Sequence, residues 1–421
     1  VLTWALLTTP ADDVEPGALT VIPTVEVFNR HLPIMEDNAY VGPVELYLQQ
    51  PFFAVFGRTL YALRILPLTM ALVGLLAAFV VFRRWFGLRV AFVAALLTAT
   101  HPVFVHESKQ GHDYEEIFTG AFFWLAVMLG DRYLQGKRPR LLWLFSATFV
   151  AGLGVCHKIT FIWYLLGLSA ALIAAAIWRR KELLATLRPL ELALSILPFL
   201  AATTTSWIYA RQSGGETIQV MARALVEPPA QDHIRQVDHL PNRMVRAQHP
   251  DATALTWEIW HPSWFRIIDG VQFPLNWLFP ILFFAGFVVV LGFAIRKHAA
   301  LPREPLFFLF IVFTVVFLCS PFTVSYHHPS HLLVMYPFPQ LVIALFLGLF
   351  SHVLGRSPLA SWATAMVLVA VVALNLNLTF SYTARVAEVY PELLPPWSEL
   401  EYTPPAAPQG EKKIRFKPNR W

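Results

Sequence analysis

Three carboxylates stand close together near the start of the chain, in the sequence Pro-Ala-Asp-Asp-Val-Glu-Pro-Gly. Asp12, Asp13 and Glu15 directly follow an apolar stretch, residues 1–9. A carboxylate beside an apolar helix can act as a general base that deprotonates a hydroxyl group. Carboxylate oxygens also suit a divalent cation, magnesium or manganese. The plain alternative is a solvated turn or a helix cap, and position alone leaves these interpretations open.

A second acidic group lies in the sequence His-Glu-Ser-Lys-Gln-Gly-His-Asp-Tyr-Glu-Glu, with carboxylates at Glu107, Asp113, Glu115 and Glu116. Asp113 and Glu116 are three positions apart, so a helix that starts here places both on one face. A helix N-terminus also favours negative charge. The group therefore predicts either acidic helpers of a catalytic site or simple helix capping.

One lysine, Lys158, stands between two apolar stretches that almost no loop separates, in Gly-Val-Cys-His-Lys-Ile-Thr. The other basic residues bunch at the opposite ends of the apolar stretches. A lone cation at this edge can bind the phosphate of a lipid carrier. The alternative is a lysine whose long side chain reaches the lipid headgroups. Phosphate binding is the favoured interpretation.

A cluster of histidines stands late in the chain, in the sequence Ser-Tyr-His-His-Pro-Ser-His. His327, His328 and His331 have a spacing that is found at zinc sites, but no cysteine or acid joins them locally. We expect a hydrogen-bonding patch at the mouth of a cavity rather than a metal site. A divalent cation at the first acidic cluster is therefore the only cofactor that we consider, and it is not certain.

The elements that must position these residues are membrane helices. Of the 421 residues, 56% are hydrophobic and only 14% are charged. A soluble domain carries about a quarter charged residues, so the composition excludes a soluble protein. Cys156 and Cys319 both lie inside apolar stretches, and we expect buried thiols rather than a disulfide.

Apolar stretches long enough to cross a bilayer, about 20 residues each, alternate with two kinds of loop. One kind is short and basic, as at Arg83–Arg84 and Arg179–Lys181, and is cytoplasmic by the positive-inside rule. The other kind carries acids, His and Trp, and faces outward. The predicted spans are 63–82, 90–106, 117–134, 141–157, 159–178, 189–208, 272–295, 305–324, 332–353 and 359–381.

The alternation predicts an all-α polytopic membrane protein with about 10–11 transmembrane helices, the first of them truncated. A transmembrane domain, residues 1–382, precedes a Pro-rich basic extracytoplasmic tail, residues 383–421. Residues 20–32 and 44–56 mix apolar and polar side chains, which is typical of juxtamembrane helices at the interface. The predicted outer loops are 10–60, 107–116, 209–271 and 325–331.

The order and sidedness of these features resemble the GT-C glycosyltransferases that use a lipid carrier, specifically bacterial relatives of the protein O-mannosyltransferases and of the aminoarabinose transferase. The resemblance covers most of residues 1–382. It implies a GT-C-like bundle with juxtamembrane helices in the first outer loop. Its motifs are Asp12-Asp13-Val-Glu15, Leu-Pro-Ile-Met-Glu-Asp-Asn-Ala-Tyr-Val-Gly-Pro, Leu63-Arg64-Ile-Leu-Pro67, Ala-Leu-Leu-Thr-Ala-Thr-His-Pro-Val-Phe-Val, Gly152-Leu-Gly-Val-Cys-His-Lys158 and His331-Leu-Leu-Val-Met-Tyr-Pro-Phe-Pro.

This resemblance implies transfer of a sugar from a polyprenyl-phosphate-linked donor to an acceptor on the extracytoplasmic face, with inversion at the sugar carbon. Asp13 would be the general base. Asp12 or Glu15 are substitutes, because this chain has Asp-Asp-Val-Glu in place of the commoner Asp-Glu pair. Lys158 would meet the donor phosphate.

The remaining roles also follow from the resemblance. Asp113 and Glu116 would be acidic helpers of the second loop. Larger members of the family carry a soluble C-terminal domain, for which residues 383–421 are too short, so residues 209–271 would recognise the acceptor.

The main alternative is a multi-span transporter or a lipid-linked sugar flippase without transferase activity. Transporters place ionisable or broken segments at mid-membrane, often in two related halves. The predicted spans have almost no charge at their centres and show no such symmetry. A polysaccharide polymerase or ligase shares the many-span plan, but the acidic motif beside the first helix favours the transferase.

We therefore expect a glycosyltransferase in a bacterial inner membrane, with its active site facing the periplasm or exterior. Its partners would be the lipid bilayer, the polyprenyl-phosphate sugar donor and an acceptor glycan, lipid or protein. We expect no nucleic acid.

Overall fold

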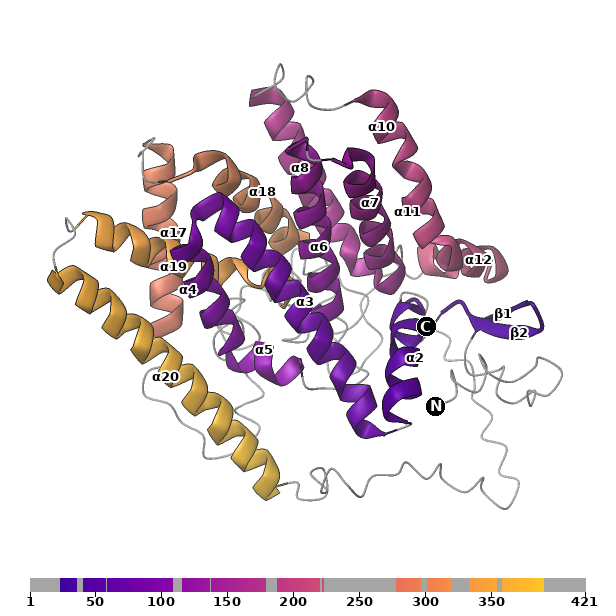
Figure 1. Cartoon of the computed structure of the whole chain (residues 1–421), viewed down its shortest axis with the longest axis horizontal. Helices are drawn as coiled ribbons and strands as arrows, with labels where there is room; N and C mark the ends of the chain where they lie inside the picture. The colour runs from indigo at the N-terminus through magenta and orange to yellow at the C-terminus, as the bar shows by residue number, and fades with distance from the viewer. Residues whose placement is uncertain are drawn as a thin grey trace.

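Helices make up most of the part of the chain that the computed structural model describes, which confirms the expected all-α class (Figure 1). That part comprises residues 23–35, 41–57, 59–108, 116–136, 138–178, 188–219, 222, 278–296, 301–319, 333–353 and 358–389. The helices are α2 (Val44–Phe56), α3 (Leu60–Phe86), α4 (Leu88–Ala99), α5 (Pro102–Glu107), α6 (Glu116–Leu134), α7 (Arg140–His157), η3 (Ile159–Phe161), α8 (Ile162–Trp178), α10 (Pro189–Leu194), α11 (Ile196–Ala202), α12 (Thr204–Gln212), α17 (Leu278–Ile295), α18 (Arg303–Cys319), α19 (Phe338–Val353) and α20 (Pro358–Val389).

The long helices have the length and composition of membrane spans. Within the described residues, α3, α6, α7 and the η3–α8 segment can each cross a bilayer, and a bent pair, Pro189–Ala202 with Thr204–Gln212, would add a fifth span. Shorter apolar helices lie in α4, α17, α19 and α20. Every predicted span contains a helix, and the chain is an integral membrane protein.

One predicted span is interrupted. Residues 90–106, expected as one helix, form α4 and α5 with a break at Thr100 and His101. Pro102 explains the break, because the residue before a proline is disfavoured in the helical conformation. Asn375 of α20 donates a hydrogen bond to the Thr100 hydroxyl at 3.2 Å, so a distant helix packs its polar side chain against this break.

The prediction of a juxtamembrane helix over residues 20–32 is wrong for the described part of that range. Strands β1 (Thr24–Val27) and β2 (Arg30–Pro33) form an antiparallel hairpin. Phe28 and Asn29 have positive φ angles of 49° and 56°, as a tight two-residue hairpin turn requires. The β-branched residues of Thr-Val-Glu-Val favour a strand over a helix here.

The second predicted segment, residues 44–56, is a helix as expected, α2; its place at the membrane interface stays a prediction. The Tyr47 hydroxyl donates to the Pro33 carbonyl at 2.7 Å, which ties α2 to the hairpin. At the other end of the chain, α20 continues to Val389, past the predicted boundary of the transmembrane domain at residue 382.

Helices α3 and α6 pack closely and form the centre of the bundle. A Cβ atom on Gly74 would lie 2.9 Å from Ala121 Cα, so only glycine allows this approach of the two backbones. Buried aromatic rings from α3, α6 and α18 fill the space beside this contact, with Phe82 and Trp124 at 5.0 Å and Trp124 and Phe313 at 6.0 Å between ring centroids. The bundle core is therefore built around α6.

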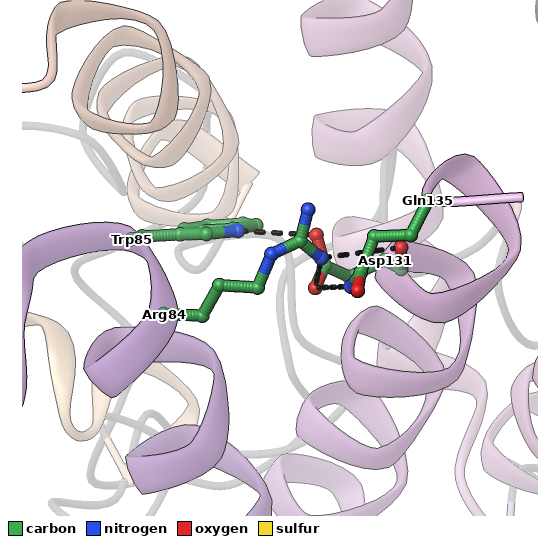
Figure 2. A network of polar contacts seen from close by, with 4 residues as sticks. All are labelled: Arg84, Trp85, Asp131 and Gln135. Atoms are coloured by element: carbon green, nitrogen blue, oxygen red, sulfur yellow. Dashed lines mark hydrogen bonds and ion pairs between the residues drawn. The ribbon is translucent and has the colours of Figure 1, made fainter. Parts of the chain in front are cut away.

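The two helices are also joined at the end where the basic loops lie. Asp131 of α6 accepts hydrogen bonds from Arg84, from Trp85 Nε1 at 3.1 Å and from Gln135 Nε2 at 2.8 Å, as Figure 2 shows. Arg84 and Trp85 belong to the last turn of α3. This Asp131 network fixes the basic end of α6 against α3.

Another carboxylate, Glu191, joins α10 to α6 and α7 at the same end. Glu191 of α10 accepts a hydrogen bond from the Tyr133 hydroxyl of α6 at 3.0 Å. It also lies 3.2 Å from Arg140 Nε at the start of α7 and 3.3 Å from Arg188. The predicted basic loops of α6, α7 and α10 therefore do lie together.

Candidate functional site

A buried ion pair joins α6 to α7 at the end of the bundle opposite the Asp131 network. Lys158 Nζ lies 2.6 Å from Glu116 Oε1, and the two side chains are only 8% and 2% exposed. Glu116 is the first residue of α6, and Lys158 directly follows α7. Removing either charge would take from the other a buried counter-charge at 2.6 Å, which is destabilising away from water.

The backbone around Lys158 is extended, which turns its side chain away from the axis of α7. Its φ and ψ are −146° and 129°, between the end of α7 and the short helix η3. Val41 forms an isolated antiparallel bridge with Lys158, and the Gly42 N–H donates to the His157 carbonyl at 2.9 Å. A segment of the first outer loop thus pairs directly with the residue that carries the ammonium group.

A second carboxyl group lies near this pair. Glu107, the last residue of α5, is fully buried, and neither of its side-chain oxygens has a hydrogen-bond partner in the described part of the chain. Burial, and to a lesser extent the charge of Glu116, raise the pKa of Glu107 to about 9. This carboxyl is therefore protonated at neutral pH, whereas its neighbour is held beside an ammonium group.

Aromatic hydroxyl and indole groups tie the segment before α19 to α6 and α8. The Trp124 indole donates to the Tyr336 carbonyl at 3.0 Å, and the Tyr164 hydroxyl donates to the Val334 carbonyl. The Tyr336 hydroxyl lies 3.1 Å from His101 Nδ1. The helix break at His101 is therefore part of the polar group around the ion pair.

A small cavity opens beside Glu116. Its volume is about 20 Å³, enough for one water molecule. Its polar wall consists of Thr98, Glu116 and Tyr336. The rest of its lining is apolar or glycine: Ala71, Gly74, Leu75, Phe104, Ile117, Gly120, Ala121, Trp124, Leu333 and Pro337.

The structure places two of the predicted site residues and brings them together. Lys158 and Glu116, expected as phosphate ligand and acidic helper, form one ion pair. The predicted Asp12, Asp13 and Glu15, as well as Asp113, lie outside the described residues, and so do His327, His328 and His331. Their roles stay predictions.

The metal prediction also stays open. Among the described residues, no three His, Cys, Asp or Glu side chains are placed to hold a metal ion. The first-loop acids for which magnesium or manganese is considered are not among them. Cys156 and Cys319 are free thiols; Cys156 is buried as predicted, whereas Cys319 is only half-buried.

Other members of this polar group were not predicted as site residues. Tyr336, in the motif His-Leu-Leu-Val-Met-Tyr-Pro-Phe-Pro, and His101 contact each other, and both are buried. Two signals could have found them: a His-Pro pair at 101–102 inside an apolar stretch and a Tyr-Pro pair at 336–337. Each marks a helix boundary with a polar aromatic side chain at membrane depth.

Comparison with known proteins supports the resemblance. Residues 40–207 match the family model described as dolichyl-phosphate-mannose-protein mannosyltransferase, which confirms the resemblance to lipid-carrier-dependent transferases over that segment. The segment contains the ion pair, Glu107 and the bridge at Val41. None of the curated proteins matches the chain.

Two solved structures are similar to the chain. One is ArnT from Cupriavidus metallidurans bound to undecaprenyl phosphate, with a TM-score of 0.47 and 14% identity, covering 79% of this chain and 54% of that one. The other is the same protein in the apo state, with a TM-score of 0.48 and 16% identity, covering 81% and 55%. The chain thus spans just over half the length of these relatives.

Proposed function

We propose that this chain, whose residues 40–207 match the family of dolichyl-phosphate-mannose-protein mannosyltransferases, is a membrane glycosyltransferase. It transfers a sugar from a polyprenyl-phosphate-linked donor to an acceptor glycan, lipid or protein. The observation that carries the proposal is the buried pair of Lys158 and Glu116 within that segment. Burying an ammonium group at membrane depth is costly, and such groups usually mark the site of an anion or a substrate.

The reaction increases negative charge at the place where a cation is needed. The acceptor oxygen attacks the anomeric carbon, the bond from that carbon to the phosphate oxygen breaks, and a base takes the hydroxyl proton. The donor is a phosphodiester, whereas the released polyprenyl phosphate is a monoester that carries an additional negative charge. A lysine beside the leaving phosphate stabilises that charge as it develops, and Lys158 is proposed for this role.

Glu116 keeps the ammonium group charged and in place before the donor arrives. A carboxylate at 2.6 Å compensates the lysine, and a phosphate oxygen can replace it without leaving the charge unpaired. The base is proposed to be Asp13, with Asp12 or Glu15 as substitutes. The acceptor oxygen that it deprotonates would attack the anomeric carbon from the side opposite the phosphate and so invert that carbon. Asp113 is proposed as a further acidic helper.

The orientation is proposed from the distribution of charge. Arg84, Arg140 and Arg188 lie at one end of the bundle, which the positive-inside rule assigns to the cytoplasm. The Lys158 pair lies at the other end, so the transfer site faces the periplasm or exterior of a bacterial inner membrane.

Transfer of labelled sugar from polyprenyl-phosphate donors, in membranes that contain the chain, tests the function. We expect donor-dependent transfer that Asp13→Asn abolishes. Lys158→Gln should reduce transfer through a higher KM for the donor and a lower kcat, because the lysine binds the donor phosphate and stabilises the charge that develops on it. Arg83→Gln, an exposed change at the basic end, is the matched control and should transfer normally. Normal transfer by Asp13→Asn would move the base to Asp12 or Glu15. Sugar-lipid flux across vesicles without any transfer would contradict the enzyme and favour a flippase.

A further inference from the structure

The first outer loop contacts the lysine through its backbone, at a position where a side chain cannot fit. A Cβ atom on Gly42 would lie 1.7 Å from the Cys156 carbonyl oxygen and 2.8 Å from the Cys156 carbonyl carbon. Both are backbone atoms, so neither can rotate away as a side chain would. Any residue other than glycine would push residues 41–43 away from the end of α7.

That close approach makes the pairing with the lysine segment possible. The Gly42 N–H reaches the His157 carbonyl at 2.9 Å, and Val41 stands opposite Lys158 as an antiparallel bridge partner. In an extended segment, successive side chains point to opposite faces. The bridge therefore fixes the rotation of the Lys158 backbone and, with it, the direction of the side chain toward Glu116.

The surroundings show why a backbone restraint is needed. Lys158 is not part of α7, whose last residue is His157, and its extended conformation interrupts the helical path into η3. The side chain of the preceding His157 is buried between Phe118 and Phe122, with ring centroids at 5.0 and 5.9 Å. The ammonium group thus belongs to a short non-helical link between α7 and η3, which Val41 and Gly42 contact from the side.

We propose that Val41–Gly42 is a positioning strap that holds Lys158 in the direction of Glu116 and of the donor phosphate. The inference rests on the proposed function, because the phosphate is the group that Lys158 would bind. Gly42 acts through the lysine and does not touch the substrate. Val41 and Gly42 connect the first outer loop to Lys158, the residue proposed to bind the donor phosphate.

Gly42→Ala tests the strap by the way in which activity is lost. We expect the KM for the polyprenyl-phosphate-linked donor to rise about tenfold, since a displacement of about 1 Å can cost up to about a hundredfold, while the KM for the acceptor stays the same. Gly130→Ala is the matched control. It lies in α6 at the basic end, and its added Cβ would meet nothing within 4 Å.

A double-variant cycle shows whether the effect passes through the lysine. Lys158→Gln alone should raise the donor KM, and Gly42→Ala should add no further rise in that background. If the donor KM of the double variant instead rises by the product of the two single increases, the proposal is overturned, because Gly42 then acts independently of Lys158. An unchanged donor KM in Gly42→Ala would overturn it as well.

Hydrogen–deuterium exchange gives a readout that does not depend on activity. The amides of Val41, Gly42 and residues 157–159 should exchange more slowly in wild-type protein when undecaprenyl phosphate is added to nanodiscs. The same amides should exchange faster in Gly42→Ala than in Gly130→Ala. If Gly42→Ala does not remain folded, unchanged exchange in the wild type on lipid addition overturns the strap. Absence of transfer from any donor, with faster exchange in Gly42→Ala, would instead contradict the proposed function and leave the strap in place.

Discussion

At the scale of single residues, the site depends on charges that compensate one another away from water. Glu116→Gln keeps the shape of the side chain but leaves the Lys158 ammonium group buried without its counter-charge. Breaking a buried ion pair in this way costs about 3–5 kcal/mol, so we expect a markedly lower midpoint of unfolding. SDS-titration unfolding in detergent micelles measures it. Glu26→Gln, at an exposed position of β1, should leave the midpoint unchanged. An equal midpoint for Glu116→Gln and wild type would show that the pair contributes nothing.

A second residue-scale prediction concerns pH. Burial and the neighbouring Glu116 raise the pKa of Glu107 from 4.5 to about 9. Between these values the folded protein keeps a proton that the unfolded chain has lost, so stability falls as pH rises from 4.5 to 9. The slope from this group is at most about 1.4 kcal/mol per pH unit.

Glu107→Gln stays neutral in both states and removes this contribution. Melting temperatures at pH 5, 7 and 9 should therefore decline less steeply in the variant than in the wild type. Parallel declines would mean that Glu107 ionises normally in the folded protein.

At the scale of elements, the Asp131 network decides how α3 and α6 meet at the basic end. Asp131→Asn removes the ionic bond to Arg84 but keeps an oxygen that Trp85 can donate to. Arg84 is 44% exposed, so we expect a loss of only about 1 kcal/mol of unfolding free energy. Removing the indole partner as well, with Asp131→Ala, should cost more. Identical unfolding midpoints for Asn, Ala and wild type would contradict a role in helix packing.

How far the elements could be predicted depends on which physical signal decides each one. Apolar length predicts a membrane helix, and every predicted span does contain a helix. Among the described residues, four of these helices, or five with the bent pair, are long and apolar enough to cross a bilayer. The segment Thr24–Pro33 forms a hairpin and not the predicted helix, because the strand preference of Thr24, Val25 and Val27 outweighs its mixed apolar and polar composition. The break at His101 was missed because hydropathy averages over a proline that stops the helix locally.

The site was predictable in its residue types but not in its contacts. Lys158 stands out in sequence as a lone cation at the wrong edge, and Glu116 as a helix-start acid. That these two bind each other requires the approach of α6 to α7 in three dimensions. The bridge from Val41 depends on backbone pairing across more than a hundred residues of sequence, which no local pattern encodes.

At the scale of the whole molecule, the distribution of charge predicts the orientation in the membrane. Phe28, at the tip of the hairpin, is 97% exposed, and Arg89 is exposed at the basic end. A membrane-impermeant maleimide should label Phe28→Cys in intact spheroplasts and Arg89→Cys only after permeabilisation. The native thiols are Cys156, which is buried, and Cys319, which is half-buried, so labelling of the unmodified chain gives the background. The reverse pattern would place the transfer site on the cytoplasmic side.

Helix α6 is held at three points along its length. Glu116 is bound at its first residue, Ala121 lies against Gly74 a turn later, and Asp131 is bound near its last turn. In mechanical terms it is a beam clamped at both ends over about 22 Å. Between Glu116 and Asp131 the helix is continuous, so a displacement of Glu116 along the axis is transmitted to Asp131. The two faces of the membrane are therefore stiffly connected through one helix.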